Sequence, residues 1–272
     1  MCTWQWGSYR MRSDRADQTQ LKKEMEEKKD MKEEAWECYE EALQCDSLRE
    51  RKRLLNEAIQ FDPDFLDAKS ELASLCTNVD TRMKKLRELQ MEEEAILERE
   101  HLMERKGSFY GIWETRPYIR LRYRIFSEFI ERRQLRLAMK EGEDILSYNE
   151  NDNTGSRYAL LAIYCLLEEF DKADDLLRRY PEESVPMLLY EAVLNYRRND
   201  RRKMRRNLRK IRERVPEVGR IAEVIEELSV MDDCYLMVNS LQEVYYYLSD
   251  FPELFTPKDL LKEMDDIWVK GK

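Results

Sequence analysis

The sequence predicts an all-α fold built from amphipathic helices that pair as hairpins. Glycine and proline occur only seven times each among 272 residues, whereas a sheet-rich chain of this length needs many more turn residues. The runs between the prolines are rich in Leu, Glu, Lys, Arg, Met and Ala, which are strong helix formers. Apolar residues in these runs recur every three or four positions, which is the spacing of a helix with one buried face.

Composition narrows the class of partner. Hydrophobic residues make up 42% of the chain, enough for a core, and charged residues make up 39%, which indicates long solvated helix faces. The 48 basic residues are mixed with 57 acidic ones, and the net charge is −9. This balance excludes a generally basic nucleic-acid-binding protein, although it leaves room for a local basic patch.

The sequence leads us to expect a cytoplasmic protein with no membrane association. Residues 1–15 lack the apolar run of a signal peptide, and no stretch approaches the roughly 18 apolar residues that span a bilayer. No two cysteines form a CxxC pair, and several fall on apolar helix faces, so we expect reduced, buried thiols. The cysteines are Cys2, Cys38, Cys45, Cys76, Cys165 and Cys234.

Three segments are expected along the chain. Residues 1–30 form a charged N-terminal extension, residues 31–232 a helical repeat domain, and residues 233–272 a set of C-terminal capping helices. Within the extension, residues 1–15 resemble a loose lead-in. Residues 16–34 are so polar that any helix there is solvated or frayed.

The repeat domain opens with Trp36, Tyr39 and Leu43, which form one apolar stripe at helical spacing. The helix over 158–167 is apolar along its whole length, which predicts the most buried helix of the chain. The capping segment has two start signals, a capping box of Ser240 with Glu243 and a helix that begins at Thr256-Pro257. In order, the other predicted helices cover 48–62, 65–77, 80–106 (broken by Gly107 and Gly111), 119–130, 135–148, about 173–180, 186–198 and 201–215.

The helix pairs recur with a period of about 34 residues, which is typical of solenoids. A pair cannot bury its apolar stripe alone, so stacking the pairs creates a continuous core and leaves one concave and one convex face. We therefore predict a right-handed α-α superhelix of helical hairpins, with irregular N- and C-terminal helices. One spacing repeats directly, since Leu55, Ala58 and Pro63 are separated like Leu208, Ile211 and Pro216.

Two stretches resemble a family of tetratricopeptide-repeat (TPR) proteins related to the "suppression of tumorigenicity seven" proteins. GSFYGIWETRPYIRLR, at residues 107–122, resembles the first signature of that family, and NDNTGSRY, at residues 151–158, resembles the second. The resemblance runs from about residue 35 to residue 265. It implies a TPR-like fold and protein binding, and it says more about fold than about molecular role.

The first candidate site is a polar cluster drawn from the two signatures. If adjacent hairpins stack, its carboxylates, guanidiniums and amides could line a groove that grips a peptide. The alternative is structural: Thr115 and Asn153 would cap helices, and Arg157 would pair with Glu114 or Asp152 and fix the packing of two repeats. The cluster comprises Glu114, Thr115, Arg116, Tyr118, Arg120, Arg122, Asn151, Asp152, Asn153, Arg157 and Tyr158.

The second candidate is a basic helix over 201–214. On this helix Met204, Leu208 and Ile211 form the buried stripe. The basic residues could bind RNA or an acidic partner, but no aromatic residue interleaves with them for base stacking. The alternative is a solvated helix neutralised by neighbouring acids. Its basic residues are Arg201, Arg202, Lys203, Arg205, Arg206, Arg209 and Lys210, followed by Arg212 and Arg214.

Catalysis has little support in the sequence. His101 is the only histidine and falls in a charged helix, and the sequence has no GxSxG, Walker A or dinucleotide motif. An enzyme would need the carboxyl groups of Glu114 and Asp152 in one water-accessible pocket. We therefore predict a non-enzymatic scaffold without cofactor or metal, a monomer or weak homodimer. Its ligand would be a protein or peptide rather than nucleic acid, bound on the concave face.

Overall fold

The computed structural model describes the backbone of residues 7–223 and 236–271, and side chains from Glu26 onward. All regular secondary structure in the described residues is helical, and the one β feature there is an isolated bridge between Ser108 and Asn149. The predicted all-α class is therefore confirmed. The chain divides into two compact units, one of Met1–Glu104 with Gly111–Ile125 and one of Arg105–Tyr110 with Phe126–Lys272.

The first unit begins with one long helix, α1 (Gly7–Gln44), which runs through the boundary expected at residue 30. Residues 7–15 are helical, contrary to the loose lead-in that we predicted. The physical reason is that no glycine or proline interrupts the chain between Gly7 and Pro63. The charged side chains of residues 26–34 are all exposed.

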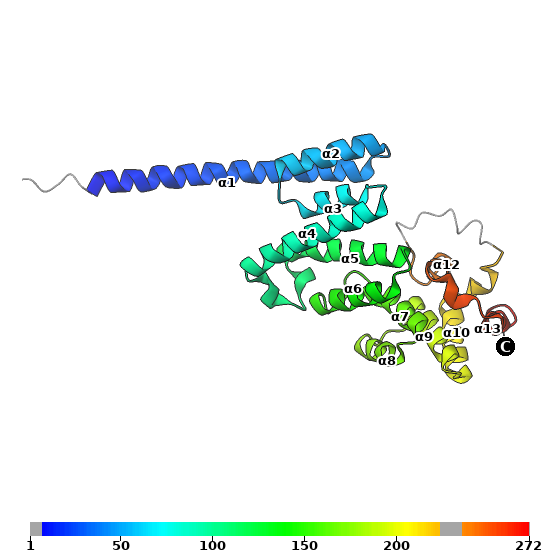
Figure 1. Ribbon diagram of the computed structural model, residues 1–272. Helices are drawn as coiled ribbons and strands as arrows, with labels where there is room; N and C mark the ends of the chain where they lie inside the picture. The colour runs from blue at the N-terminus through cyan, green and yellow to red at the C-terminus, as the bar shows by residue number, and fades with distance from the viewer. Residues whose placement is uncertain (1–6, 224–235, 272) are drawn as a thin grey trace, which may run out of the picture. The chain divides into compact units, whose positions relative to one another are not determined.

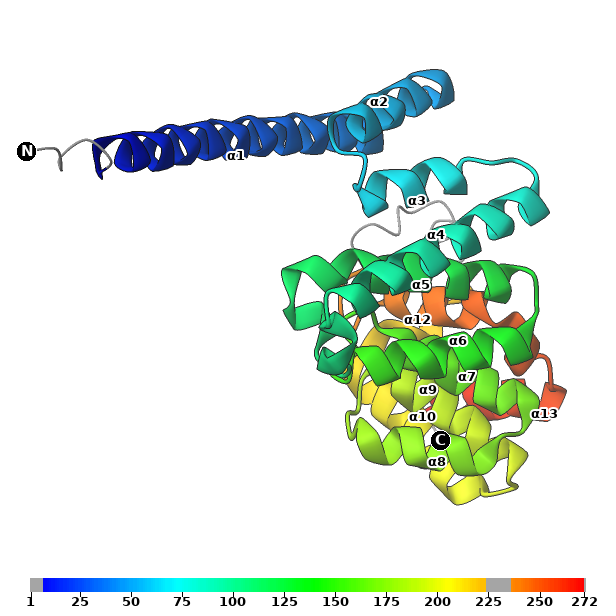
Figure 2. The ribbon, with the colours of Figure 1, turned by 60° about the vertical axis from the view of Figure 1, so that its left-hand side comes forward.

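Helix α2 (Leu48–Phe61) folds back along the end of α1, and the two lie side by side (Figures 1 and 2). The stripe of α1 that packs on α2 differs from the prediction, because Trp36 and Leu43 are exposed whereas Ala35 and Ala42 are buried around Tyr39. Small alanines allow the two helices to approach closely.

Two helices complete the packing of the first unit. They are α3 (Leu66–Ser74), which contacts α2, and α4 (Val79–Arg99), which contacts α3. The predicted helix over 80–106 was too long, because His101 takes a left-handed conformation (φ 57°) that stops the helix before Gly107. The chain then makes short 3₁₀ turns at Leu102–Arg105, Phe109–Gly111 and Trp113–Thr115 and enters α5 (Arg116–Glu131), whose residues up to Ile125 belong to this unit.

The second unit packs its helices mostly in chain order (Figure 2). Helix α7 contacts α6, α8 and α9, while α9 also contacts α10 and α12. Ten residues of α9 are buried, compared with seven residues of α7. The prediction that the 158–167 segment is the most buried helix is therefore wrong, since α9 is more buried. The bounds are α6 Leu135–Tyr148, α7 Ser156–Leu167, α8 Phe170–Arg179, α9 Val185–Arg197, α10 Arg201–Arg214, α12 Leu241–Asp250 and α13 Lys258–Trp268, with 3₁₀ turns at Pro216–Arg220 and Pro252–Phe255.

The predicted capping box at the start of α12 is present. The Ser240 hydroxyl accepts a hydrogen bond from the Glu243 backbone N–H (3.1 Å), and the Glu243 carboxylate accepts one from the Asn239 N–H (2.6 Å). The last helix, α13, docks on α10 through Trp268, whose indole N–H donates to the Leu208 carbonyl at 3.0 Å. Among the helices described, none has both the length and the apolarity needed to cross a bilayer.

Gly219 allows the chain after α10 to approach α13 closely. A Cβ atom at this position would lie 2.5 Å from the Trp268 carbonyl oxygen, which is backbone and cannot rotate away. We expect Gly219→Ala to lower the free energy of unfolding by about 1–3 kcal/mol, in the range of overpacking substitutions. Chemical denaturation followed by circular dichroism measures the change. Gly111→Ala is the matched control, since nothing lies within 4 Å of its Cβ position, and an equal loss in both variants would contradict this account.

Candidate partner-binding site

The predicted polar cluster falls on both compact units. Its first half, Glu114–Arg122, belongs to the first unit, and its second half, Asn151–Tyr158, belongs to the second. Each half forms a set of contacts with residues of its own unit that the sequence did not reveal.

In the first half, Arg120 forms a two-pronged ion pair with a buried carboxylate of α3. Its Nε and Nη2 atoms donate to the two Asp67 oxygens at 2.7 and 2.5 Å. One helical turn on, Glu71 accepts from Arg124 of α5 (2.6 Å) and from Arg51 of α2 (2.9 Å). Acids at i and i+4 on α3 thus face arginines at i and i+4 on α5, which ties three helices of this unit together.

The other members of the first half also have structural contacts. Tyr118 is fully buried and donates to Glu94 at 2.6 Å, and the buried Arg122 donates to the Tyr118 oxygen at 3.2 Å. Thr115 ends the 3₁₀ turn that precedes α5, and its hydroxyl donates to the Ile112 carbonyl at 3.2 Å. Two members lie closer to solvent. Glu114 is exposed, and Arg116 is partly buried beside the exposed ring of Trp113.

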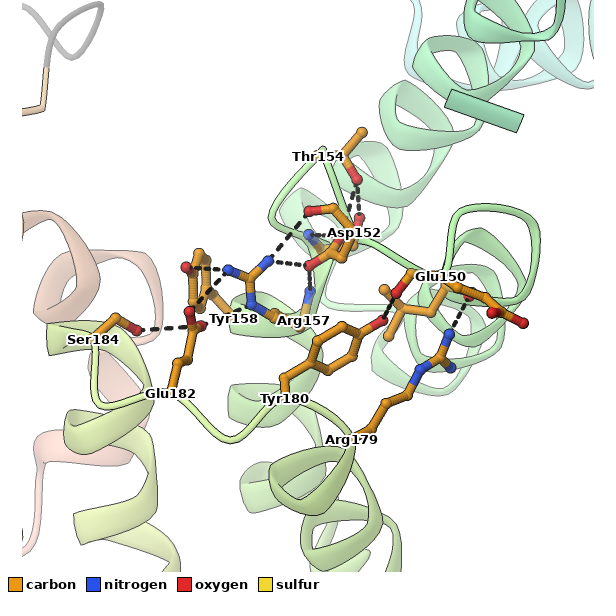
Figure 3. A network of polar contacts seen from close by, with 11 residues as sticks. Glu150, Asp152, Thr154, Arg157, Tyr158, Arg179, Tyr180, Glu182 and Ser184 are labelled. Carbon is orange, nitrogen blue, oxygen red and sulfur yellow. Dashed lines mark hydrogen bonds and ion pairs between the residues drawn. The ribbon is translucent and has the colours of Figure 1, made fainter. Parts of the chain in front are cut away.

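In the second half, Asp152 caps helix α7 (Figure 3). Its side chain is fully buried and accepts from the backbone N–H groups of Ser156 and Arg157, both at 2.9 Å. The Thr154 hydroxyl and the Arg157 guanidinium also donate to it. Asp152 reaches these donors because it takes a left-handed conformation (φ 48°), which Asp adopts more readily than most residues. The predicted cap, Asn153, is exposed instead.

Arg157 joins this cap to the loop between α8 and α9 (Figure 3). Nη1 donates to Asp152 at 2.8 Å and Nε donates to Glu182 at 2.8 Å, and the guanidinium lies 4.2 Å from the centre of the Tyr158 ring. Burial disfavours the charge, but the hydrogen bonds to Glu182 and Asp152 outweigh it and raise the pKa of Arg157 above its ordinary value. The ion pair between Arg157 and Asp152 is one of the two pairings that we expected if Arg157 has a structural role. The ion pair with Glu182 was not predicted.

Two residues at the end of α8, Arg179 and Tyr180, add hydrogen bonds to this network. Tyr180 donates to the Glu150 carbonyl at 2.8 Å, and Arg179 donates to the Leu146 carbonyl at 2.8 Å. Burial raises the pKa of the Tyr180 hydroxyl, which favours its role as a neutral donor. These contacts join the end of α8 to the end of α6, so this half of the cluster holds two successive hairpins together.

No family identification follows from comparison with known proteins. No model of a known protein family matches the chain, and no curated protein matches it either. The likeness to TPR proteins therefore rests on the sequence, namely on the two stretches and on the spacing of apolar residues and prolines.

The second candidate, α10, has two flanks neutralised by acids of its own unit. On one flank, Arg201 pairs with Asp259 at 2.5 Å and Arg205 pairs with Glu263 at 2.7 Å, and both acids belong to α13. Arg212 of α10 also contacts α13, because its guanidinium donates to the Ile267 carbonyl at 2.8 Å. On the other flank, Lys210 and Arg214 share Glu183, while Lys203 pairs with Asp200 at the start of the helix.

The histidine and cysteine residues do not form a metal site in the part of the chain that the structure describes. His101 is exposed and lies 3.3 Å from Glu104. No group of three or more His, Cys, Asp or Glu side chains in the described residues is placed to hold a metal ion. The described cysteines form no disulfide: Cys165 is buried, and Cys38, Cys45 and Cys76 are partly buried. Cys2 and Cys234 lie outside the residues whose side chains are described.

Proposed function

We propose that the chain is a non-enzymatic scaffold that binds a peptide or protein segment through the solvent faces of its helical hairpins. The observation that best supports this proposal is the order of packing in the second unit, where α6, α7, α9 and α10 contact one another in sequence. Helices α6 and α10 keep exposed faces, whereas α7 and α9 lie in the interior of the unit and have no exposed residue. Stacked repeats of this kind present extended surfaces to their partners.

The proposal extends to a TPR-like right-handed superhelix with its ligand on the concave face. In this reading, Asp152, Arg157 and Glu182 hold successive hairpins in register, since their hydrogen-bonding groups already have partners. Binding would then fall to exposed side chains that have no such partner.

Affinity capture with chemical cross-linking and mass spectrometry tests this function. We expect one or a few protein partners in near-stoichiometric amounts, with cross-links from exposed lysines such as Lys140 and Lys262. A soluble helical protein of similar net charge is the control bait. Failure to enrich any protein over that control would contradict the scaffold proposal.

A second candidate function is anion binding by α10, either to RNA or to an acidic protein. It is favoured by the arginines of α10 that the flanking acids do not reach. RNA binding predicts retention on immobilised RNA that weakens steeply with salt. Equal retention at low and physiological ionic strength would exclude it.

A further inference from the structure

The outward face of α10 carries a row of arginines that form no ion pair with any described acid. Arg202, Arg206 and Arg209 are exposed, and no described residue forms an ion pair or hydrogen bond with them. They follow one another at i, i+4 and i+7, so they share one face of the helix over about 10 Å. We call these three residues the arginine stripe.

The arginine stripe lies directly opposite the buried face of α10. At about 100° per residue its members point away from Met204, Leu208 and Ile211, which are at most 1% exposed. The acids of α13 and Glu183 neutralise the two flanks in between. The guanidinium groups of the arginine stripe remain hydrated in the free protein, so they are available for charge-assisted hydrogen bonds with a partner.

The surroundings favour carboxylates over a phosphate backbone as the ligand. Glu213 continues the line of the stripe at i+4 from Arg209 and is exposed, so a polyanion running along the helix would meet a negative charge. Asp259 and Glu263 border the stripe on one side. Affinity for nucleic acid grows with the number of phosphates that a protein neutralises, and three arginines bordered by acids neutralise few.

We propose that the arginine stripe docks an acidic segment of a partner protein, whose carboxylates form ion pairs with Arg202, Arg206 and Arg209. Arginine suits this task because its planar fork binds a carboxylate through two parallel hydrogen bonds. A helical partner with acids at i, i+4 and i+7 would match the spacing, and a basic residue one turn later would face Glu213. The inference rests on the proposed scaffold function and specifies its surface and its partner.

Fluorescence anisotropy with a defined probe tests the proposal. The probe is a labelled, alanine-rich helical peptide with three glutamates spaced i, i+4 and i+7, and the same peptide with glutamines and a labelled oligouridylate are the comparisons. The wild type should bind the glutamate peptide at low ionic strength, more tightly than either comparison, and bind it less tightly as salt is added. Tighter binding of the oligouridylate, or equal binding of the glutamine peptide, would overturn the proposal.

Charge reversal locates the binding on the stripe. The triple variant Arg202→Glu, Arg206→Glu, Arg209→Glu should bind the glutamate peptide about tenfold more weakly or worse, because three exposed ion pairs are lost and replaced by repulsion between like charges. The matched control, Lys28→Glu, Lys32→Glu, Lys140→Glu, has the same net charge and alters exposed lysines elsewhere. Unchanged affinity in the stripe variant, or equal losses in both, would overturn the proposal.

Two further measurements keep the outcome interpretable. Thermal melting checks that the stripe variant is folded, and the milder triple replacement of the same arginines by glutamine should give an intermediate affinity. Capture of protein partners from extract separates the two proposals. If the stripe variant captures the same partners as the wild type, the stripe is not the docking surface, although the scaffold function stands.

Discussion

Asp152→Ala is expected to lower the free energy of unfolding by about 3 kcal/mol, because it removes one of the two carboxylates that pair with the largely buried Arg157 and leaves Glu182 as the only one. The Ser156 and Arg157 N–H groups would also lose their acceptor at the start of α7. Alanine would in addition be held at a φ of 48°, where an ordinary side chain is strained. For a unit of this size, the loss corresponds to a fall in Tm of about 10 °C.

Calorimetry of Asp152→Ala against two other variants checks this result. Asp152→Asn keeps an acceptor and tolerates the left-handed conformation, so it should cost less than the alanine variant. Asn153→Ala changes an exposed neighbour in the same turn and should stay within about 0.5 kcal/mol of the wild type. A stable Asp152→Ala variant would mean that this network does not hold the hairpins together.

Asp250→Asn is expected to stabilise the protein at pH 8 by about 2 kcal/mol and to have little effect near pH 4. Burial at the end of α12 raises the pKa of Asp250 to about 6, since the attraction of Arg133 does not compensate and Glu253 adds repulsion. Arg133 is itself paired with Glu253 at 3.0 Å. The figure is reduced from the full shift because the side chain keeps partial contact with solvent.

The sign of the pH dependence follows from proton binding. Between about pH 4 and 6 the folded protein retains a proton on Asp250 that the unfolded chain releases, so stability falls as the pH rises through this window. The asparagine variant lacks this loss. Urea denaturation of both proteins from pH 4 to 8 measures it, with the exposed Glu217→Gln as control. A difference between variant and wild type that is the same at every pH would contradict the prediction.

The helices of the second unit were largely predictable because amphipathic periodicity is local. Helix α6 begins at Leu135 and ends at Tyr148, as its apolar spacing predicts. The buried stripe of α1 was less predictable, because Trp36 and Leu43 have the same helical spacing as Ala35 and Ala42. Only the close approach of α2 decides which set is covered.

The contacts of the candidate residues could not be read from the sequence in the same way. Arg157 was singled out, but its partner Glu182 lies 25 residues away, in a loop whose position depends on how α8 folds back. Likewise, α10 is evidently basic, yet the acids that neutralise Arg201 and Arg205 come from α13, 58 residues further on. Periodicity places the arginine stripe opposite the core, and the tertiary structure is needed to show that the acids of α13 and Glu183 pair with the flanks of α10 and not with the stripe.

We assign a structural role to Arg157 and a binding role to the arginine stripe. Measuring thermal stability and partner capture on the same variants tests both roles most directly. Asp152→Ala, which removes the partner of Arg157, should lose thermal stability but, at a temperature where it remains folded, capture as much partner per folded molecule as the wild type. The arginine stripe variant should keep its Tm and lose capture. The reverse pattern, with capture lost in a stable Asp152→Ala variant and retained in the stripe variant, would contradict the account.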